Sequence, residues 1–275
     1  MKKCWLDKKA FVVTGASSGL GKGIAEKLIK NHGCTVYAIG RSEEKLRAFS
    51  EQLGDSASLL IPVKMDVSDS AAWEAFTNEL KTSGKSVDGL INCAGIFPPF
   101  NRTLNVPEDT FKQVMEVDYF ACIKAINALY PILSASPCPA IINVGSASSL
   151  ATIVGTSAYS AAKSAIKAYT EALIYEQKGK AYVALVMPGF ARTEIFRSQN
   201  STIDSNKLFV MMSMPAERMA SKIYRGIKRK RTRMVLGADA KAMCFFYRLF
   251  PRLTMAAIKG VLKKSNMKLF EDVFK

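Results

Sequence analysis

Short apolar runs alternate with longer amphipathic stretches along most of the chain, and this alternation restricts the fold more than any other feature. Each run lacks the alternating polar residues of a half-exposed strand, so it predicts a strand buried on both faces. Strands that alternate with helices form a parallel sheet with helices on both sides. We therefore expect an α/β chain with a doubly wound parallel sheet. The predicted strands are residues 10–14, 35–39, 59–65, 89–95, 140–144, 182–186 and 234–236.

A glycine-rich turn joins the first predicted strand to a helical pattern. The turn reads Gly15-Ala16-Ser17-Ser18-Gly19-Leu20-Gly21. Backbone N–H groups in such a turn approach a phosphate closely, and the positive end of the following helix favours the anion. The spacing is not that of a P-loop, because Lys22 is followed by Gly23 rather than by Ser or Thr. The turn predicts a phosphate site, although a tight strand–helix turn in any α/β protein has the same pattern.

The second predicted strand is followed by Gly40 and Arg41. In dinucleotide-binding folds an acidic residue near this point binds the ribose 2′-hydroxyl. Here no acidic residue is present, Gly40 leaves room, and Arg41 supplies a cation that suits a 2′-phosphate. The sequence therefore predicts NADP(H) as the cofactor. The alternative is that Arg41 is a solvated residue at the start of a helix.

Tyr159 and Lys163 are four residues apart in a predicted helix, so their side chains share one face. A fixed cation favours the phenolate and lowers the pKa of a tyrosine from its usual value of about 10. Such a tyrosine transfers a proton to or from a substrate oxygen. Ser146, at the end of the run 140–144, is expected to hold the same oxygen. Alone, Tyr-x-x-x-Lys is a weak signal that two surface residues would also match.

Taken together, these motifs resemble those of the short-chain dehydrogenase/reductase family over about residues 8–237, in both order and spacing. The family has a single Rossmann-type domain, so the resemblance implies a catalytic domain at 1–237 and an extension at 238–275. The matching motifs are Thr14-Gly15-x-x-x-Gly19-x-Gly21, Asp66-Val67, Asn92-Cys93-Ala94-Gly95, Ser146, Tyr159-x-x-x-Lys163 and Pro188-Gly189-x-x-x-Thr193.

The resemblance also implies a role for each matching position. Ser146, Tyr159 and Lys163 would be catalytic, and Lys163 would also bind the nicotinamide ribose and lower the pKa of Tyr159. Other positions would contact the phosphates, adenine, ribose or nicotinamide carboxamide. The implied cofactor-binding residues are Gly15, Ser17, Ser18, Gly19, Leu20, Gly21, Arg41, Asp66, Val67, Asn92, Ala94, Gly95, Tyr159, Lys163, Pro188, Gly189 and Thr193.

Asp118 departs from the family pattern, since many members have asparagine there, supporting a water relay to the active-site lysine. It is counted with the catalytic residues. A carboxylate at this position accepts the same hydrogen bonds, but it would also pair with Lys163 and oppose the lowering of the pKa of Tyr159. Alternatively, Asp118 is protonated. The milder departure is Cys93, where the family has a second asparagine.

Basic residues are concentrated at the C-terminus. The net charge is +16, and residues 216–275 hold 16 Lys or Arg and 4 Asp or Glu, which leaves +12 in this segment. Pro251 is expected to break a helix. Residues 252–263 form a basic amphipathic pattern, so residues 242–264 predict peripheral contact with an anionic membrane. The alternatives are that the segment covers the protein's own pocket or a dimer partner. No nucleic-acid recognition motif is evident, so we expect no nucleic-acid partner.

The remaining features are weaker guides. The scattered cysteines predict reduced thiols in a cytoplasmic protein, and the single histidine, His32, predicts a surface or capping residue; neither forms a metal-binding pattern. No secretory leader is apparent. The apolar stretch 96–100 predicts a wall of a lipophilic pocket, and 195–214 predicts a substrate lid or a loop packed on the core.

We therefore expect an NADP(H)-dependent oxidoreductase that interconverts a carbonyl and a secondary alcohol on a lipophilic small molecule such as a steroid, retinoid or keto-lipid. The alternative is a catalytically weak NADPH-binding regulatory protein on the same fold. The resemblance implies a homodimer or tetramer that pairs through the predicted helices 107–133 and 157–177.

Overall fold

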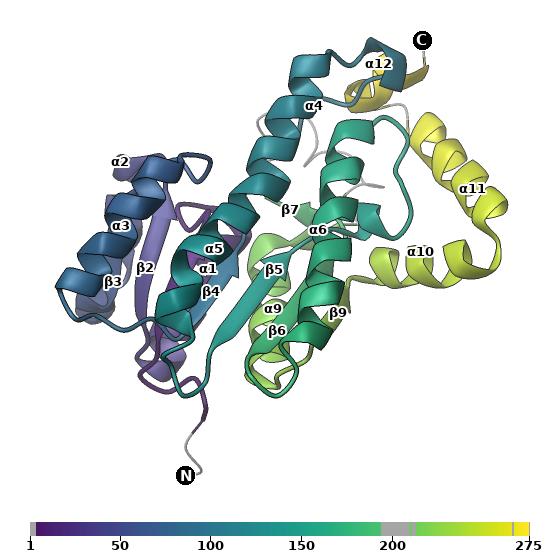
Figure 1. The fold of residues 1–275 in the computed structure, drawn as a ribbon. Helices are drawn as coiled ribbons and strands as arrows, with labels where there is room; N and C mark the ends of the chain where they lie inside the picture. Colours follow the sequence, from purple (N-terminus) through teal and green to yellow (C-terminus); the bar gives the residue numbers. More distant parts are fainter. Residues whose placement is uncertain (1–3, 194–209, 211–212, 266, 275) are drawn as a thin grey trace.

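A parallel seven-stranded sheet with the order β3-β2-β1-β4-β5-β6-β9 forms the centre of the molecule (Figure 1). The computed structural model describes residues 4–193, 210, 213–265 and 267–274. The strand order reverses between β1 and β4, as in doubly wound sheets. The predicted α/β fold is confirmed. The strands of this sheet are β1 (Ala10–Thr14), β2 (Thr35–Gly40), β3 (Leu60–Lys64), β4 (Gly89–Asn92), β5 (Ala140–Val144), β6 (Tyr182–Pro188) and β9 (Arg233–Leu236).

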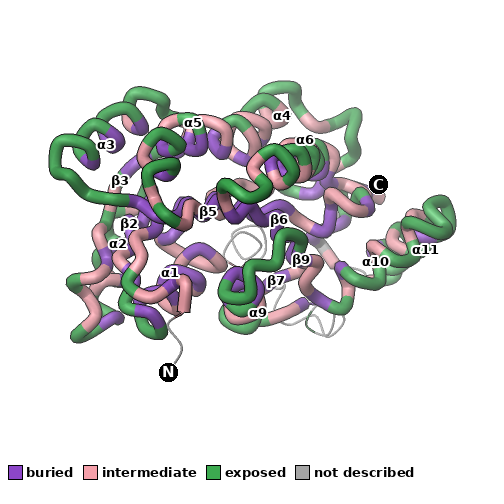
Figure 2. Tube along the Cα trace, turned by 60° about the horizontal axis from the view of Figure 1, so that its bottom comes forward, coloured by how far each residue is buried: buried purple, intermediate pink, exposed green. Residues whose placement is uncertain are grey.

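Helices cover both faces of the sheet and enclose two hydrophobic cores. One core lies under α1 (Gly19–His32), α2 (Glu43–Gln52) and α9 (Ala216–Lys228). The other lies under α3 (Ser70–Thr82), α5 (Ala121–Leu133) and α6 (Ser157–Glu176), which pass in front of the sheet in Figure 1. Figure 2 shows that the strands are mostly buried. This burial on both faces explains the apolar runs of the central strands, whereas β3, at the edge of the sheet, exposes Pro62 and Lys64.

The predicted helix at 107–133 is continuous in direction but irregular at its centre. It consists of α4 (Glu108–Met115), a π-helical turn at Glu116–Phe120, and α5. Such turns insert one residue into the helical ladder and are frequent at functional sites. The turn contains Asp118, which is completely buried.

The extension at 238–275 folds into α10 (Ala238–Leu249), α11 (Pro251–Lys264) and α12 (Glu271–Phe274). The predicted break at Pro251 is confirmed, since α10 ends and α11 begins there. Phe270 and Val273 pack with Phe100 and Ile153 in a small third core, so the end of the extension is attached to the part of the chain that forms the sheet. The predicted lid falls largely on residues 194–209 and 211–212, which lie outside the described part.

Of the two alternatives predicted for His32, a surface or a capping residue, the surface position is wrong, although His32 is the last residue of α1. Its side chain is buried at the end of α1, where the Nδ1 atom lies 2.6 Å from Asp7 Oδ1 and the Nε2 atom lies 2.8 Å from the Tyr224 hydroxyl. The N-terminal segment and α9 cover this end of the helix, a contact that the local sequence does not reveal. Gly33 does end the helix, with a left-handed φ of 60°.

Candidate active site

A cavity of about 570 Å³ opens at the carboxyl ends of the strands, beside the point where the strand order reverses. In open α/β sheets this is the position at which ligands bind. Half of the residues that line it were predicted from sequence. They are Gly15, Ser17, Ser18, Gly19, Leu20, Gly21, Arg41, Asp66, Val67, Ala94, Gly95, Asp118, Ser146, Tyr159, Lys163, Pro188, Gly189 and Thr193.

Asn92 is the one predicted site residue that does not line the cavity. It is the last residue of β4, in the middle of the sheet, and its side chain is buried. Its amide donates a hydrogen bond to Asn143 Oδ1 on β5 at 2.9 Å, and the Asn143 amide donates to the Thr170 hydroxyl at 2.9 Å. This chain of bonds joins two central strands to α6. In this structure Asn92 holds the strands in place and does not face the cavity.

The turn after β1 is held close to the loop after β4. Thr14 Oγ1 accepts hydrogen bonds from the N–H groups of Cys93 at 3.0 Å and Ala94 at 3.1 Å. A Cβ atom on Gly15 would lie 2.9 Å from the Ala94 backbone, and Gly15 also has a φ of 67°. A Cβ atom on Gly21 would lie 2.4 Å from the Gly15 carbonyl oxygen. Both positions therefore require glycine for the turn to stay this tight.

Two elements bring Tyr159, Lys163 and Ser146 to one wall of the cavity. Tyr159 and Lys163 lie one turn apart on α6, and the lysine Nζ atom is 5.6 Å from the centre of the phenol ring. Ser146 follows β5, and the hydrogen bond from its hydroxyl is one of the influences that lower the pKa of Tyr159. The Ser146 hydroxyl also accepts from the Ser148 N–H at 3.1 Å, which fixes its orientation.

Asp118 and Lys163 form a buried ion pair beneath the tyrosine. The Lys163 Nζ atom lies 3.1 Å from Asp118 Oδ2, and Asp118 Oδ1 accepts a hydrogen bond from the Ile96 N–H at 2.7 Å. Burial raises the pKa of Asp118, while the Lys163 cation opposes that rise. The pKa of Lys163 is raised despite burial, because Asp118 and Tyr159 favour its charged form. The lysine is therefore a permanent cation at neutral pH.

The pKa of Tyr159 is raised above its usual value, whereas the sequence predicts that it is lowered. Burial is the largest influence and raises the pKa of the phenol above its usual value. Lys163 lowers it, as predicted, but Asp118 raises it in turn. The sequence shows the neighbouring cation but not the depth at which the phenol lies, and the depth decides the sign.

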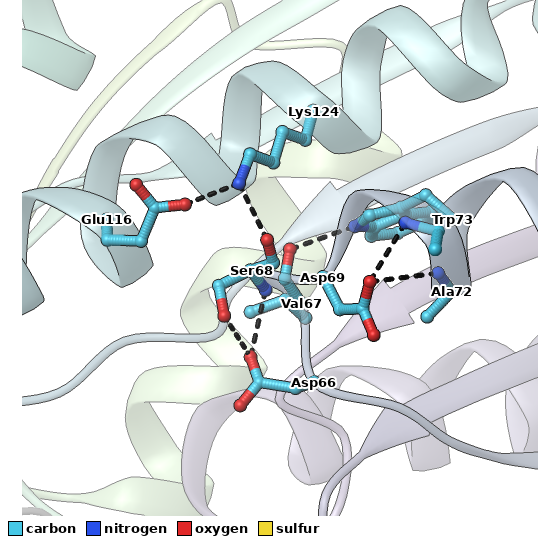
Figure 3. A network of polar contacts seen from close by, with 9 residues as sticks. Asp66, Val67, Ser68, Asp69, Ala72, Trp73, Glu116 and Lys124 are labelled. Carbon is cyan, nitrogen blue, oxygen red and sulfur yellow. Dashed lines mark hydrogen bonds and ion pairs between the residues drawn. The ribbon is translucent and has the colours of Figure 1, made fainter.

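The far end of the cavity is bordered by a loop after β3 that contains Asp66 and Val67. Figure 3 shows the polar contacts that hold it. Asp66 Oδ1 accepts from the N–H and hydroxyl of Ser68, at 2.9 and 2.6 Å, and the Val67 carbonyl accepts from the Trp73 indole at 2.9 Å. Lys124 of α5 donates to the Ser68 carbonyl at 2.6 Å. The loop is thus fixed from both α3 and α5.

Arg41 borders the same end of the cavity and lies near Asp66. Its side chain is exposed. The pKa of Asp66 is lowered mainly by the two hydrogen bonds from Ser68, and the charge of Arg41 lowers it further. A Cβ atom on the preceding residue, Gly40, would lie 3.0 Å from the Ser17 side chain. The two glycine-containing segments therefore pack closely together beside Arg41.

The extension contributes two cavity residues that sequence reasoning missed, Asp239 and Met243 of α10. Asp239 Oδ2 accepts a hydrogen bond from the Phe190 N–H at 2.7 Å and so holds the loop after β6. A Cβ atom on Gly189 would lie 2.1 Å from this carboxylate. Burial raises the pKa of Asp239, against the opposing effect of backbone hydrogen bonds. In the local sequence, the one feature that could have identified Asp239 is its position two residues after Gly237.

One wall of the cavity is apolar and continues into the third core. The Phe97 ring packs edge-on against the Tyr159 ring, with centroids 4.6 Å apart, and also contacts Phe100. Phe100 packs in turn on Phe270. Two residues of the apolar stretch 96–100 that was predicted to form a wall of a pocket, Ile96 and Phe97, line the cavity, and Phe97 lies beside the tyrosine. The cavity residues of this wall are Ile96, Phe97, Ile153, Phe190 and Met243.

Comparison with known proteins gives a consistent result. The short chain dehydrogenase family model matches residues 9–204. The rat protein dehydrogenase/reductase SDR family member 7B is 28% identical, over 96% of this chain and 84% of its own. The 3-oxoacyl-[acyl-carrier-protein] reductase FabG of Salmonella typhimurium is 27% identical, over 77% of this chain and 84% of its own. A short chain dehydrogenase from Burkholderia cenocepacia, solved in complex with NADP, superimposes with a TM-score of 0.76 at 23% identity, covering 92% of this chain and 98% of its own.

Proposed function

The chain belongs to the short-chain dehydrogenase family, and we propose that it is an NADP(H)-dependent oxidoreductase that interconverts a carbonyl and a secondary alcohol on a lipophilic substrate. The observation that carries the proposal is the arrangement of Ser146, Tyr159 and Lys163 on one wall of a cavity that begins at the glycine-rich turn. With this arrangement, the groups proposed for proton transfer and those proposed for phosphate binding would share a single space.

The residues present fit a dinucleotide. The turn from Gly15 to Gly21 lines the cavity and leads into the N-terminus of α1, where a phosphate would be favoured. The loop at Asp66 and Val67 would hold the adenine end, and Pro188, Gly189 and Thr193 the nicotinamide end. Arg41 would pair with a 2′-phosphate. The NADP in the Burkholderia cenocepacia neighbour supports this preference.

When bound, the cofactor supplies or accepts the hydride, and the residues of this chain manage the substrate oxygen. In the direction of reduction, Ser146 orients the carbonyl oxygen and Tyr159 donates the proton that forms the alcohol. In oxidation the Tyr159 phenolate accepts that proton. Lys163, a buried cation, stabilises the phenolate in both directions.

A lipophilic substrate is proposed because the wall beside Tyr159 is apolar. The side chains of Phe97, Ile153 and Met243 line this part of the cavity, so a carbonyl presented to Tyr159 would have its substituents against hydrocarbon. Keto-lipids, steroids and retinoids meet this requirement. The 3-oxoacyl group in the name of the Salmonella typhimurium relative is a substrate of this kind.

The test is consumption of NADPH and NADH on a panel of lipophilic ketones and 3-oxoacyl thioesters, with Tyr159→Phe as the inactive control. The proposal predicts turnover with NADPH that the variant lacks. NADPH binding by fluorescence, with no turnover on any substrate, would favour the regulatory alternative. Equal or better turnover with NADH would remove the role of Arg41 in cofactor choice.

We also propose a cytoplasmic homodimer or tetramer. Exposed aromatic side chains on the predicted pairing helices support the oligomer, namely Phe120, Tyr130 and Tyr175. All six cysteines are free thiols, which suits a reducing compartment. Within the described residues, none of the helices has the length and apolarity needed to cross a bilayer.

A further inference from the structure

Exposed apolar side chains are concentrated on α10 and α11, which we call the C-terminal hairpin (residues 238–264). Of the eleven large apolar side chains that are exposed in the described residues, six belong to it. Elsewhere such side chains are scattered singly, which is normal for a soluble surface. A contiguous group requires another explanation. The six are Phe245, Phe246, Leu249, Phe250, Leu253 and Val261.

The bend of the hairpin carries three of these side chains. Phe250 lies at the junction of the two helices, directly before Pro251, and Leu249 and Leu253 flank it. The exposed fractions are 54% for Phe250 and 70% for Leu253. Figures 1 and 2 show both helices projecting to one side of the molecule, away from the sheet. The bend is therefore free to contact a large external surface.

The inner face of the hairpin is already occupied by the protein. Ile258 and Leu262 of α11 pack in the third core with Phe100 and Phe270, and Met243 of α10 packs there and lines the cavity. Membrane contact and covering of the protein's own pocket, both considered above for this segment, thus fall on different faces of the hairpin. The inner face covers the cavity, and the outer face and the bend have no covering element within the described residues.

The exposed charges of the hairpin are all positive. Its single acidic residue, Asp239, points inward and accepts a hydrogen bond from Phe190. Its basic side chains are all exposed, and none of them forms an ion pair within the part of the chain that the structure describes. These residues are Lys241, Arg248, Arg252, Lys259, Lys263 and Lys264.

We infer that the C-terminal hairpin docks on an anionic lipid bilayer, with the exposed apolar side chains of its bend inserted among the acyl chains and its cations beside the headgroups. Aromatic and apolar side chains next to unpaired cations fit a surface that is apolar inside and negative outside. A second copy of the chain would bring two sets of like charges together, which disfavours a dimer through this face. Since α10 lines the cavity, docking would also bring the proposed lipophilic substrate close to its site, a consequence that rests on the proposed function.

The test uses the full-length protein and vesicles of phosphatidylcholine alone or mixed with phosphatidylglycerol. We expect the protein to sediment with the mixed vesicles. Phe250→Ser should weaken the partition coefficient by about tenfold, the loss expected when one phenylalanine is no longer buried. The double variant Phe245→Ser/Phe246→Ser should weaken it further. Leu104→Ser removes a side chain that is 98% exposed elsewhere on the surface and should sediment like the unmodified protein.

The charge contribution is tested separately. Arg248→Gln/Arg252→Gln should reduce binding to the mixed vesicles by about fivefold for each cation removed and should also reduce its sensitivity to salt. Lys81→Gln/Lys85→Gln removes two exposed cations from the opposite end of the molecule and should have no effect. Circular dichroism checks that each variant is folded.

Several results would overturn the inference. One is that the unmodified protein sediments with neither kind of vesicle. Another is that the Phe250 and Leu104 variants bind equally well. A mass twice that of the chain in light scattering, reduced to one by Phe250→Ser, would identify a second copy as the occupant. These readouts do not involve catalysis, so an inactive protein that still binds vesicles would refute the proposed function and leave this inference standing.

Discussion

Replacing Asp118 by asparagine removes one charge from the candidate active site and little else. The side chain keeps an acceptor for the Ile96 N–H, which now donates to Asp118 Oδ1 at 2.7 Å. It loses the negative charge that lies 3.1 Å from Lys163 Nζ. Lys163 then acts on Tyr159 as an uncompensated cation. Because Asp118 is one of the influences that raise the pKa of Tyr159, its neutralisation must lower that pKa.

The size of the effect follows from the position of the lysine. At 5.6 Å from the phenol ring centre, a unit charge interacts with a phenolate by about 3 kcal/mol at an effective dielectric constant of about 20. Asp118, on the other side of the lysine, cancels part of this attraction. If about half is restored in the variant, the phenolate fraction at a given pH below the midpoint rises about tenfold.

The assay is the pH dependence of kcat/KM for alcohol oxidation, which requires the phenolate. We expect Asp118→Asn to keep activity and to move the acid limb of this profile to lower pH. Asp88→Asn is the matched control, because Asp88 is also buried and paired with a lysine, Lys9 at 2.9 Å, but precedes β4 at the opposite end of the sheet. An acid limb that stays in place, or moves to higher pH, in Asp118→Asn alone would refute a charged Asp118 coupled to Tyr159.

Three further predictions concern other residues. Asp88→Asn should lower the free energy of unfolding by about 2 kcal/mol at neutral pH. Burial raises the pKa of Asp88, but hydrogen bonds from Ser136, Ala10 and Lys9 outweigh burial and lower the pKa overall. The stabilisation by the carboxylate is therefore full above the unfolded-state pKa of about 3.9 and is lost as the pH falls through the lower folded-state value, so the urea denaturation curves of the variant and the unmodified protein should converge in strong acid. Arg41→Ala should raise the KM for NADPH by about tenfold or more and leave that for NADH unchanged, as steady-state kinetics would show. Asp239→Ala should raise the KM for the cofactor by about tenfold because the Phe190 N–H loses its acceptor, whereas Asp239→Asn, which keeps an acceptor, should change it much less.

Much of the fold and most of the candidate site follow from local sequence patterns. The strands were predictable because a strand buried on both faces is rich in apolar residues, and β1, β2 and β6 contain long apolar runs. Tyr159 and Lys163 were predictable as neighbours because the helical repeat places residues four apart on one face. The tight turn from Gly15 to Gly21 was predictable because its geometry excludes side chains.

The tertiary structure decided what depends on contacts between distant segments. Asp239 and Met243 reach the cavity because α10 folds back beside the loop after β6, and Asn92 turns away because Asn143 of the neighbouring strand takes its amide. Burial, which no local pattern specifies, determines whether the pKa of Tyr159 is raised or lowered. The periodicity of residues 252–263 identifies an amphipathic helix, but only packing shows which of its apolar side chains meet the protein and which remain exposed. Periodicity is a property of neighbouring residues along the chain, whereas burial is set by residues that approach from elsewhere.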